Sequence, residues 1–433
     1  MAWVVVISVL VMIILSLARV HVIIAILTAG LIAGLMAGLN LVESITLLVE
    51  GMGGQSSAAL SYILLGAFAA AISYTGITHL LVRYLIRVLT GKRTMLVLVI
   101  AGIASLSQNL VPVHIAFIPI LIPPLLKLFD QMDLDRRAVA TALTFGLKAP
   151  YVMIPAGFGL LFHETILKGM ANNGVDISTN EIALALLIPG SGMIVGLLIA
   201  VFITYRKPKK ADNQSLNSKE DELDPVVTFN GKHWLTIIAI IGALVMQLVT
   251  DNLIIGALTG LILMFAFLVV PFKKGDFIMT EGITMMGTIA FVMLIASGFG
   301  HVLSETGAVI ALVEVSSDLL GDNKALIAVV LLLVGLLITM GIGSSFGTIP
   351  ILAALYVPIC IATGFSPMAT AALIGTAGAL GDAGSPASDS TLGPTSGLNA
   401  DGKHHHIWDT CVPTFIHFNI PLFIFGWIAA LVL

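Results

Sequence analysis

The sequence predicts an all-α protein that crosses a membrane many times, built as an inverted-topology repeat with two re-entrant hairpins and two broken transmembrane helices. Three observations support this fold class. Hydrophobic residues make up 58% of the 433 residues, charged residues only 10%, and the mean hydropathy is +1.07. Soluble domains carry about 25% charged residues, so lipid must surround most of this chain. The other two observations are one polar linker and two apolar segments that glycine and proline interrupt.

The polar linker, residues 206–233, holds 11 of the 44 charged residues and separates two halves of similar length. We therefore expect a first repeat over 1–205 and a second repeat over 234–433, joined by a cytoplasmic linker. The mixed charges of the linker disfavour binding to nucleic acid. The two cysteines, Cys360 and Cys411, lie in apolar surroundings, which argues against a disulfide framework or a thiolate metal site.

Each half contains apolar runs that meet or approach the about 20 residues that a helix needs to cross a bilayer. We expect spanning helices near 2–18, 21–38, 57–76, 137–164 (broken), 182–205, 234–250, 253–271, 284–303, 366–392 (broken) and 408–432. Segments 94–126 and 325–362 are apolar but interrupted by polar residues and glycine. The arms of the first are about 14 residues long, too short to cross a bilayer. We interpret both segments as re-entrant hairpins.

The basic residues support an inverted arrangement of the two halves. If each hairpin returns to its starting side, 17 of the 20 basic residues fall on one face, which the positive-inside tendency makes cytoplasmic. The hairpins then enter from opposite faces, as in the inverted repeats of secondary transporters. Pro119 and Pro155 are 36 residues apart, as are Pro350 and Pro386, which supports two equivalent halves. We expect a multi-pass protein of the cell (inner) membrane.

The second broken segment carries the most informative polar residues. Residues 381–391, GDAGSPASDST, follow an apolar run, and their glycines and proline prevent a helix from continuing. A carboxylate at membrane depth needs a proton or cation to neutralise it, which makes Asp382 and Asp389 candidates for binding H⁺ or Na⁺. Three hydroxyl residues could add oxygen ligands: Ser385, Ser388 and Thr391. Capping a helix or satisfying broken backbone is the structural alternative for each of them.

Lys148 lies in the broken segment of the first half and is the candidate partner of these carboxylates. A lysine at membrane depth must pair with an anion or lose its proton. It could form a salt bridge with Asp382 in the resting state, or it could bind the carboxylate of an organic substrate. A purely structural ion pair is the third alternative.

Polar residues at or near the hairpin tips are further candidates for substrate binding, because half-helices direct their dipoles there. These residues are Gln108, Asn109, His114, Ser344, Ser345 and Thr348. The histidine could sense protons, or it could serve structure alone. A second group, His404, His405 and His406, is expected in a solvated loop, because three consecutive side chains do not easily converge on one metal.

The motif Gly381-Asp382 followed by Ser385-Pro386-x-Ser388-Asp389-x-Thr391 closely resembles the G-D-x-x-S-P-x-S-D-T-T signature of NhaC-type sodium/proton antiporters. Ser390 stands where that family usually has threonine, and it retains the hydroxyl. The layout of hairpins and repeats is similar to the wider ion transporter superfamily. The resemblance implies a scaffold domain, a transport domain and usually a homodimer. Related branches include carriers of organic anions and amino acids.

Secondary active transport is therefore favoured over an enzymatic activity, and neither a Walker lysine motif nor an H-E-x-x-H sequence is present. The leading hypothesis is sodium/proton antiport by alternating access, with Asp382 and Asp389 binding Na⁺ and H⁺ in turn and no cofactor beyond these coupling ions. The second is Na⁺- or H⁺-coupled transport of a small amino acid, including a basic one or histidine. A channel or membrane scaffold is the third. The expected partners are a small ion or small-molecule substrate and the lipid bilayer.

Overall fold

The computed structural model of the protein describes residues 1–18, 20–77, 80, 91–109, 117–156, 158–209, 229–250, 252–311, 323–343 and 345–433. Every regular element in this part of the chain is helical, which confirms the all-α prediction. The predictions made for His114 and Ser344 lie outside the described residues.

The first half folds into a series of helices that follow the expected apolar runs. They are α1 (Ala2–Leu17), α2 (Val22–Met36), α3 (Leu41–Met52), η1 (Gly53–Gln55), α4 (Ser56–Tyr74), α6 (Arg93–Asn109), α7 (Ile118–Leu121), η3 (Pro123–Leu125), α8 (Leu126–Gln131), α9 (Arg136–Met153), α10 (Phe158–Asn172), α11 (Thr179–Ile199) and the π-helical turn η4 (Ala200–Thr204).

The second half is helical as well. Its elements are α12 (Gly231–Thr250), α13 (Leu253–Ala266), η6 (Phe272–Lys274), α14 (Gly275–Glu305), α16 (Lys324–Ile342), α17 (Ser345–Ala362), α18 (Pro367–Ala379), η7 (Asp382–Gly384), α19 (Asp389–Leu398), η8 (His406–Cys411), α20 (Val412–Thr414), η9 (Phe415–Asn419) and α21 (Ile420–Val432).

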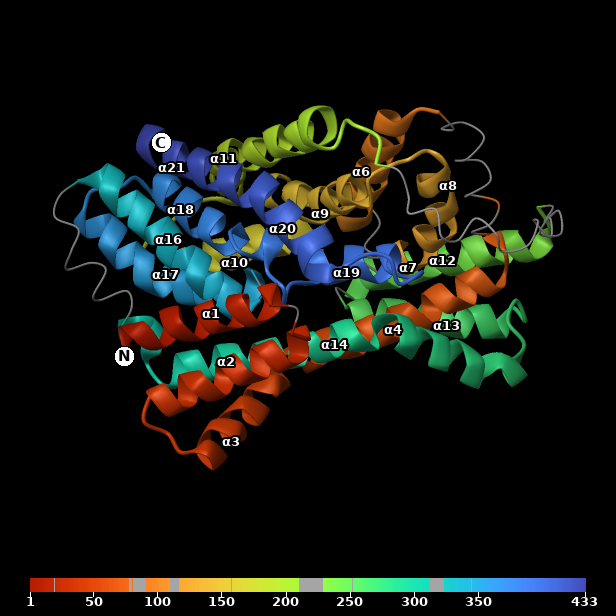
Figure 1. Ribbon diagram of the computed structural model, residues 1–433, viewed down its shortest axis with the longest axis horizontal. Helices are drawn as coiled ribbons and strands as arrows, with labels where there is room; N and C mark the ends of the chain where they lie inside the picture. The colour runs from red at the N-terminus through yellow and green to blue at the C-terminus, as the bar shows by residue number, and fades with distance from the viewer. Residues whose placement is uncertain are drawn as a thin grey trace.

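The helices form two layers (Figure 1). We call α2, α3, α4, α12, α13 and α14 the scaffold layer, and α6 to α11 with α16 to α21 the broken-helix layer. Helix α1 packs against both, through α2 and α16. Helices α4 and α14 run side by side through the scaffold layer, and glycine permits their close approach. A Cβ atom on Gly282 would lie 2.3 Å from the backbone nitrogen of Ala67.

The helices at the expected spans differ in length. Within the described residues, four helical runs are long and apolar enough to cross a membrane, namely Thr179–Thr204, Phe272–Glu305, Lys324–Ile342 and His406–Val432, and the bent pair α3–α4 would make a fifth. The spans expected at 2–18, 21–38 and 253–271 are helices of 16, 15 and 14 residues. At 1.5 Å per residue they reach only about 21–24 Å, short of a ~30 Å bilayer core.

These short helices pack in a reciprocal way. Helix α2 of the first half packs against α14 of the second, and α13 of the second half packs against α4 of the first. Equivalent elements also recur at a constant spacing: α6 and α16 begin at Arg93 and Lys324, and α9 and α18 at Arg136 and Pro367, each 231 residues apart. These regularities support two equivalent halves, and the repeat and its inverted orientation stay predictions.

Both expected helix breaks are present. Helix α9 ends at Met153 and α10 begins at Phe158, and α18 ends at Ala379, ten residues before α19 begins at Asp389. The segment expected as the second hairpin contains α16 and α17, of 19 and 18 residues, and Gly343 after α16 has a φ of +71°. The re-entrant course of both hairpin segments stays a prediction.

Charged residues at one end of the broken-helix layer connect the start of α9 to the loop after α19. The Arg136 guanidinium lies 2.7 Å from Asp401 and 3.0 Å from Asp130, and it donates to the carbonyl oxygen of Leu398. The hydrogen bond from Arg136 lowers the pKa of the Asp401 carboxyl. Lys403 follows in the same loop, so this end belongs to the face on which the basic residues are predicted to gather.

Candidate functional site

The break between α18 and α19 forms the centre of the candidate site. Leu380 is extended, and Gly381 has a φ of +79°, which residues with a Cβ rarely adopt. A Cβ on Gly381 would also lie 2.6 Å from Cγ of Met340 on α16. The single turn η7 then leads through extended Ser385 to α19, and every residue from 381 to 388 is buried.

Neighbouring side chains bond the backbone groups that this break frees. Ser390 Oγ donates to the carbonyl oxygen of Asp382 at 2.9 Å, and Thr391 Oγ1 donates to that of Ser385 at 2.6 Å. His406 Nε2 lies 2.9 Å from the carbonyl oxygen of Pro386. On the other side, the Gly381 N–H donates to Oδ1 of Asn419 at 2.8 Å. Protein groups therefore replace the helical hydrogen bonds, as an irregular backbone at membrane depth requires.

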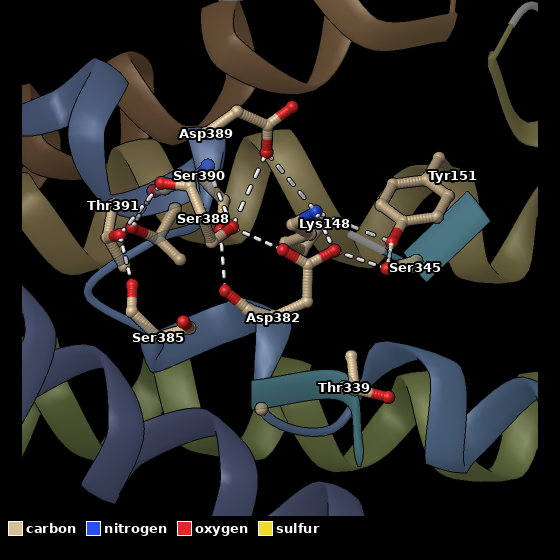
Figure 2. Close-up of polar contacts among 12 residues, drawn as sticks. Lys148, Tyr151, Thr339, Ser345, Asp382, Ser385, Ser388, Asp389, Ser390 and Thr391 are labelled. Atoms are coloured by element: carbon tan, nitrogen blue, oxygen red, sulfur yellow. Dashed lines mark hydrogen bonds and ion pairs between the residues drawn. The ribbon is translucent and has the colours of Figure 1, made fainter. Parts of the chain in front are cut away.

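The Asp382 carboxylate lies inside this break and is 2% exposed. Figure 2 shows it between three donors from three helical segments. Lys148 Nζ from α9 lies 2.5 Å from its Oδ2 atom, and Ser345 Oγ at the start of α17 donates to the same oxygen. Ser388 Oγ, the N-cap of α19, donates to Oδ1. The salt bridge considered for Lys148 and Asp382 is thus present.

Lys148 contacts more than one anion. Its Nζ lies 3.5 Å from Oδ1 of Asp389, the first residue of α19, and 3.5 Å from the hydroxyl of Tyr151. The ammonium also lies 5.0 Å from the centre of the Tyr151 ring, within range of a cation–π contact. One buried ammonium is therefore shared by two carboxylates, so the three groups sum to −1 when all are ionised.

Two tyrosines complete the site, and sequence reasoning missed both as site residues. The Tyr62 hydroxyl, from α4 of the scaffold layer, donates to Oδ2 of Asp389 at 3.0 Å. The Tyr151 hydroxyl lies 2.8 Å from Ser345 Oγ. Tyr151 precedes Asp382 by 231 residues, the spacing of the repeated helices, so that spacing could have indicated it. No sequence signal pointed to Tyr62.

The other predicted site residues lie outside the immediate contacts of the two carboxylates or outside the described side chains. The hydroxyls of Ser385 and Thr391 bond backbone groups and not the carboxylates: Ser385 Oγ donates to Met340 O and accepts from the Ala387 N–H. In this conformation Ser385 and Thr391 satisfy the broken backbone, which was the structural alternative to cation binding. Thr348 is buried on α17, one turn beyond Ser345. Gln108 and Asn109 end α6, and their side chains lie outside the described part of the chain.

The three consecutive histidines are not in a solvated loop, which corrects the prediction. His404 is buried, and His405 and His406 are half-buried. Burial lowers the pKa of His404 to about 4, and its Nε2 lies 2.7 Å from the Thr410 hydroxyl. The polar sequence around them suggested solvent exposure, but the turn η8 folds them against α19.

Comparison with known proteins identifies the family. A model of the Na⁺/H⁺ antiporter family matches residues 142–427, and a second antiporter family model matches residues 4–89. The chain belongs to the Na⁺/H⁺ antiporter family. This confirms the resemblance seen at residues 381–391, and it makes the chain a membrane-embedded secondary transporter and not an enzyme.

Relatives along the whole chain are known. The chain is 51% identical to an uncharacterized membrane protein of Vibrio parahaemolyticus over 99% of both chains. It is 49% identical, again over 99% of both, to the Bacillus subtilis protein YuiF, whose name proposes that it transports amino acids. Among solved structures it is similar to the YdaH transporter of Alcanivorax borkumensis, with 15% identity, a TM-score of 0.47, and coverage of 89% of this chain and 87% of that one.

Proposed function

We propose that the protein exchanges Na⁺ for H⁺ by alternating access, with Asp382 and Asp389 as the cation-binding carboxylates. The observation that carries this proposal is the group formed by buried Lys148, buried Asp382 and half-buried Asp389, whose charges sum to −1. A buried net charge is costly, so the site is most stable when one further cation or proton occupies it. Na⁺ and H⁺ would therefore compete for the same negative charge.

The exchange follows from how the ammonium of Lys148 is shared. When a proton neutralises Asp389, Lys148 remains paired with Asp382 at 2.5 Å. When Na⁺ replaces that proton, it binds the carboxylate oxygens, and the hydroxyls of Ser345 and Ser388 can turn their lone pairs toward it. Hydroxyl and carboxylate oxygens suit a hard cation. Lys148 then moves toward whichever carboxylate the ion leaves uncompensated.

A second candidate is cation-coupled transport of a small amino acid. The similarity to YuiF over the whole chain favours it. In this case Lys148 would release Asp382 and bind the carboxylate of the substrate, while Asp382 and Asp389 would hold the coupling cation. Under either candidate we expect a homodimer in the cell (inner) membrane, with the basic face in the cytoplasm.

The test uses Asp382→Asn protein reconstituted in liposomes, with an imposed Na⁺ gradient and a pH-sensitive dye inside. We expect Na⁺-driven H⁺ movement to fall to the level of empty liposomes. Asp135→Asn is the matched control, because Asp135 is also buried and ion-paired, with Arg137, and asparagine preserves its role as the N-cap of α9.

Wild-type-like H⁺ movement in Asp382→Asn would contradict the proposed role of this carboxylate. Transport assays on the wild-type protein distinguish the two candidate functions. H⁺ movement driven by Na⁺ alone indicates antiport, whereas radiolabelled amino-acid uptake that requires an imposed Na⁺ or H⁺ gradient indicates the second candidate.

A further inference from the structure

Asp389 connects the two layers of the molecule, because its two carboxylate oxygens have partners on opposite sides. Oδ1 faces the broken-helix layer, where Lys148 Nζ and Ser388 Oγ each lie 3.5 Å away. Oδ2 accepts a hydrogen bond from the Tyr62 hydroxyl of scaffold helix α4 at 3.0 Å. In Figure 2 the second oxygen of Asp389 points away from Lys148. One carboxylate of the candidate cation site therefore contacts both layers.

The packing of the scaffold layer fixes the place of Tyr62. The residue is only 4% exposed. One helical turn further along α4, a Cβ atom on Gly66 would lie 2.6 Å from the carbonyl oxygen of Gly282 on α14. Helices α4 and α14 therefore pack backbone against backbone beside the tyrosine. The Tyr62 hydroxyl belongs to the scaffold layer, whereas its acceptor belongs to α19.

Of the two carboxylates, Asp389 is the one whose charge Lys148 compensates less. The ammonium lies 2.5 Å from Asp382 and 3.5 Å from Asp389, and the attraction between charges falls with distance. Asp382 also accepts hydrogen bonds from two serine hydroxyls. When both carboxylates are ionised and no cation is bound, the uncompensated negative charge thus lies mainly on Asp389, to which Tyr62 donates.

The strength of the bond from Tyr62 depends on what Asp389 binds. A tyrosine hydroxyl is protonated at neutral pH, so it donates to an ionised carboxylate. Hydrogen bonds to an ionised group are roughly twice as strong as those between neutral groups. A proton or Na⁺ on Asp389 neutralises the carboxylate and removes this extra strength. The contact between the two layers is therefore stronger when the site is empty than when it is loaded.

We propose that Tyr62 is a positioning residue that restrains the empty transporter, because its bond to ionised Asp389 holds the broken-helix layer against the scaffold layer until a cation loads the site. The proposal rests on the exchange of Na⁺ for H⁺ proposed above. Alternating access moves one bundle of helices against another, so this bond opens whenever Asp389 turns from one face of the membrane to the other. An exchanger that made this movement with an empty site would let Na⁺ leak without H⁺ in return.

The test compares two rates of Na⁺ efflux from liposomes that contain the protein and radioactive Na⁺. Both are measured at alkaline pH, where protons are scarce, with K⁺ and valinomycin to hold the membrane potential at zero. Efflux into buffer that contains Na⁺ measures exchange, in which the site is loaded in both directions. Efflux into buffer without Na⁺ measures net release, which requires the empty site to return. In the wild-type protein we expect exchange to be much the faster.

Tyr62→Phe keeps the ring and removes the hydroxyl. We expect net release to rise, so that the ratio of exchange to net release falls about five- to tenfold, which is the difference between a charged and a neutral hydrogen bond. Tyr356→Phe is the matched control. Tyr356 is also buried, but its hydroxyl donates to the carbonyl oxygen of Leu331 at 2.5 Å, within the broken-helix layer. This control should leave the ratio unchanged.

A purely structural role for Tyr62 would slow both rates together and leave their ratio as it is. An unchanged ratio in Tyr62→Phe, the loss of both rates, or an equal fall in Tyr356→Phe would therefore overturn this inference. The absence of Na⁺ movement in the wild-type protein would overturn the proposed exchange and this inference with it. Exchange that Asp382→Asn abolishes, with an unchanged ratio in Tyr62→Phe, would overturn this inference alone.

Discussion

The two broken helices occupy equivalent places in the predicted repeat but differ in how their breaks are built. At the first break, Ile154 is 47% exposed, and the carbonyl oxygen of Val152 lies 2.8 Å from His163 Nε2. At the second break, all residues from 381 to 388 are buried, and three carbonyl oxygens accept hydrogen bonds from Ser390, Thr391 and His406. The second break is thus the one organised as a polar site.

The two halves contribute opposite charges to the site, and each charge lies on a different kind of backbone. Lys148 projects from the continuous part of α9, five residues before that helix ends at Met153. Asp382 lies on a non-helical backbone between two helices. The first half therefore holds its positive charge on a helix, and the second half holds its negative charge on the non-helical backbone of the break.

The strongest test of this division removes the positive charge. Lys148→Met leaves buried Asp382 and half-buried Asp389 without their ammonium, and we expect a loss of about 3–5 kcal/mol in the free energy of unfolding. Adding Asp382→Asn removes one uncompensated charge and should recover part of the loss. The measurement is denaturant unfolding of the purified single and double variants in detergent.

Two results would change the interpretation of Lys148. A single variant that stays stable but binds its substrate weakly, with no recovery in the double variant, would assign Lys148 to substrate binding. Additive losses of stability with unchanged substrate affinity would contradict both roles, and the 2.5 Å contact would then contribute nothing specific.

The second test concerns the hydroxyls that satisfy the polar break. Thr391→Val preserves side-chain shape but leaves the buried carbonyl oxygen of Ser385 without its 2.6 Å donor, which should cost about 1–3 kcal/mol and slow transport. Thr141→Val is the matched control. Thr141 is equally buried, but its hydroxyl bonds the Ala138 carbonyl within intact α9, where the helix supplies other donors. Equal losses of unfolding free energy in both variants would show that a lost hydrogen bond costs no more at the break than inside a helix.

Local chemistry made the second break predictable from the sequence. Gly381 and Pro386 cannot sit in a continuing helix, and Asp382 in an apolar run must find a partner. Burial and charge therefore made the ion pair with Lys148 one of the alternatives that the sequence offered, and the structure contains it. Tyr62 was not predictable, because its contact with Asp389 spans 327 positions and depends on how the two layers pack. Periodicity and composition do not predict contacts between residues so far apart in the sequence.

Hydropathy predicted apolar helices at 2–18 and 21–38, and the structure contains them as α1 and α2 with 16 and 15 residues. They pack against α16 and α14 and leave large apolar side chains such as Trp3 and Ile24 exposed. Their crossing of the membrane stays a prediction. Hydropathy failed at the histidines 404–406, since a polar sequence was buried by the fold.

The smallest effect is expected at the first break. His163→Phe removes the bond to the Val152 carbonyl, but it also removes a buried Nδ1 atom that has no hydrogen-bond partner among the residues that the structure describes. These two effects oppose each other, so the free energy of unfolding should change by no more than about 1 kcal/mol. Transport should continue at the wild-type rate, because His163 contacts neither carboxylate among the bonds described. The measurement is the same liposome assay as for Asp382→Asn, with unfolding in detergent alongside. A loss of transport in a stable His163→Phe protein would place the first break within the transport site, and the two breaks would then share one task.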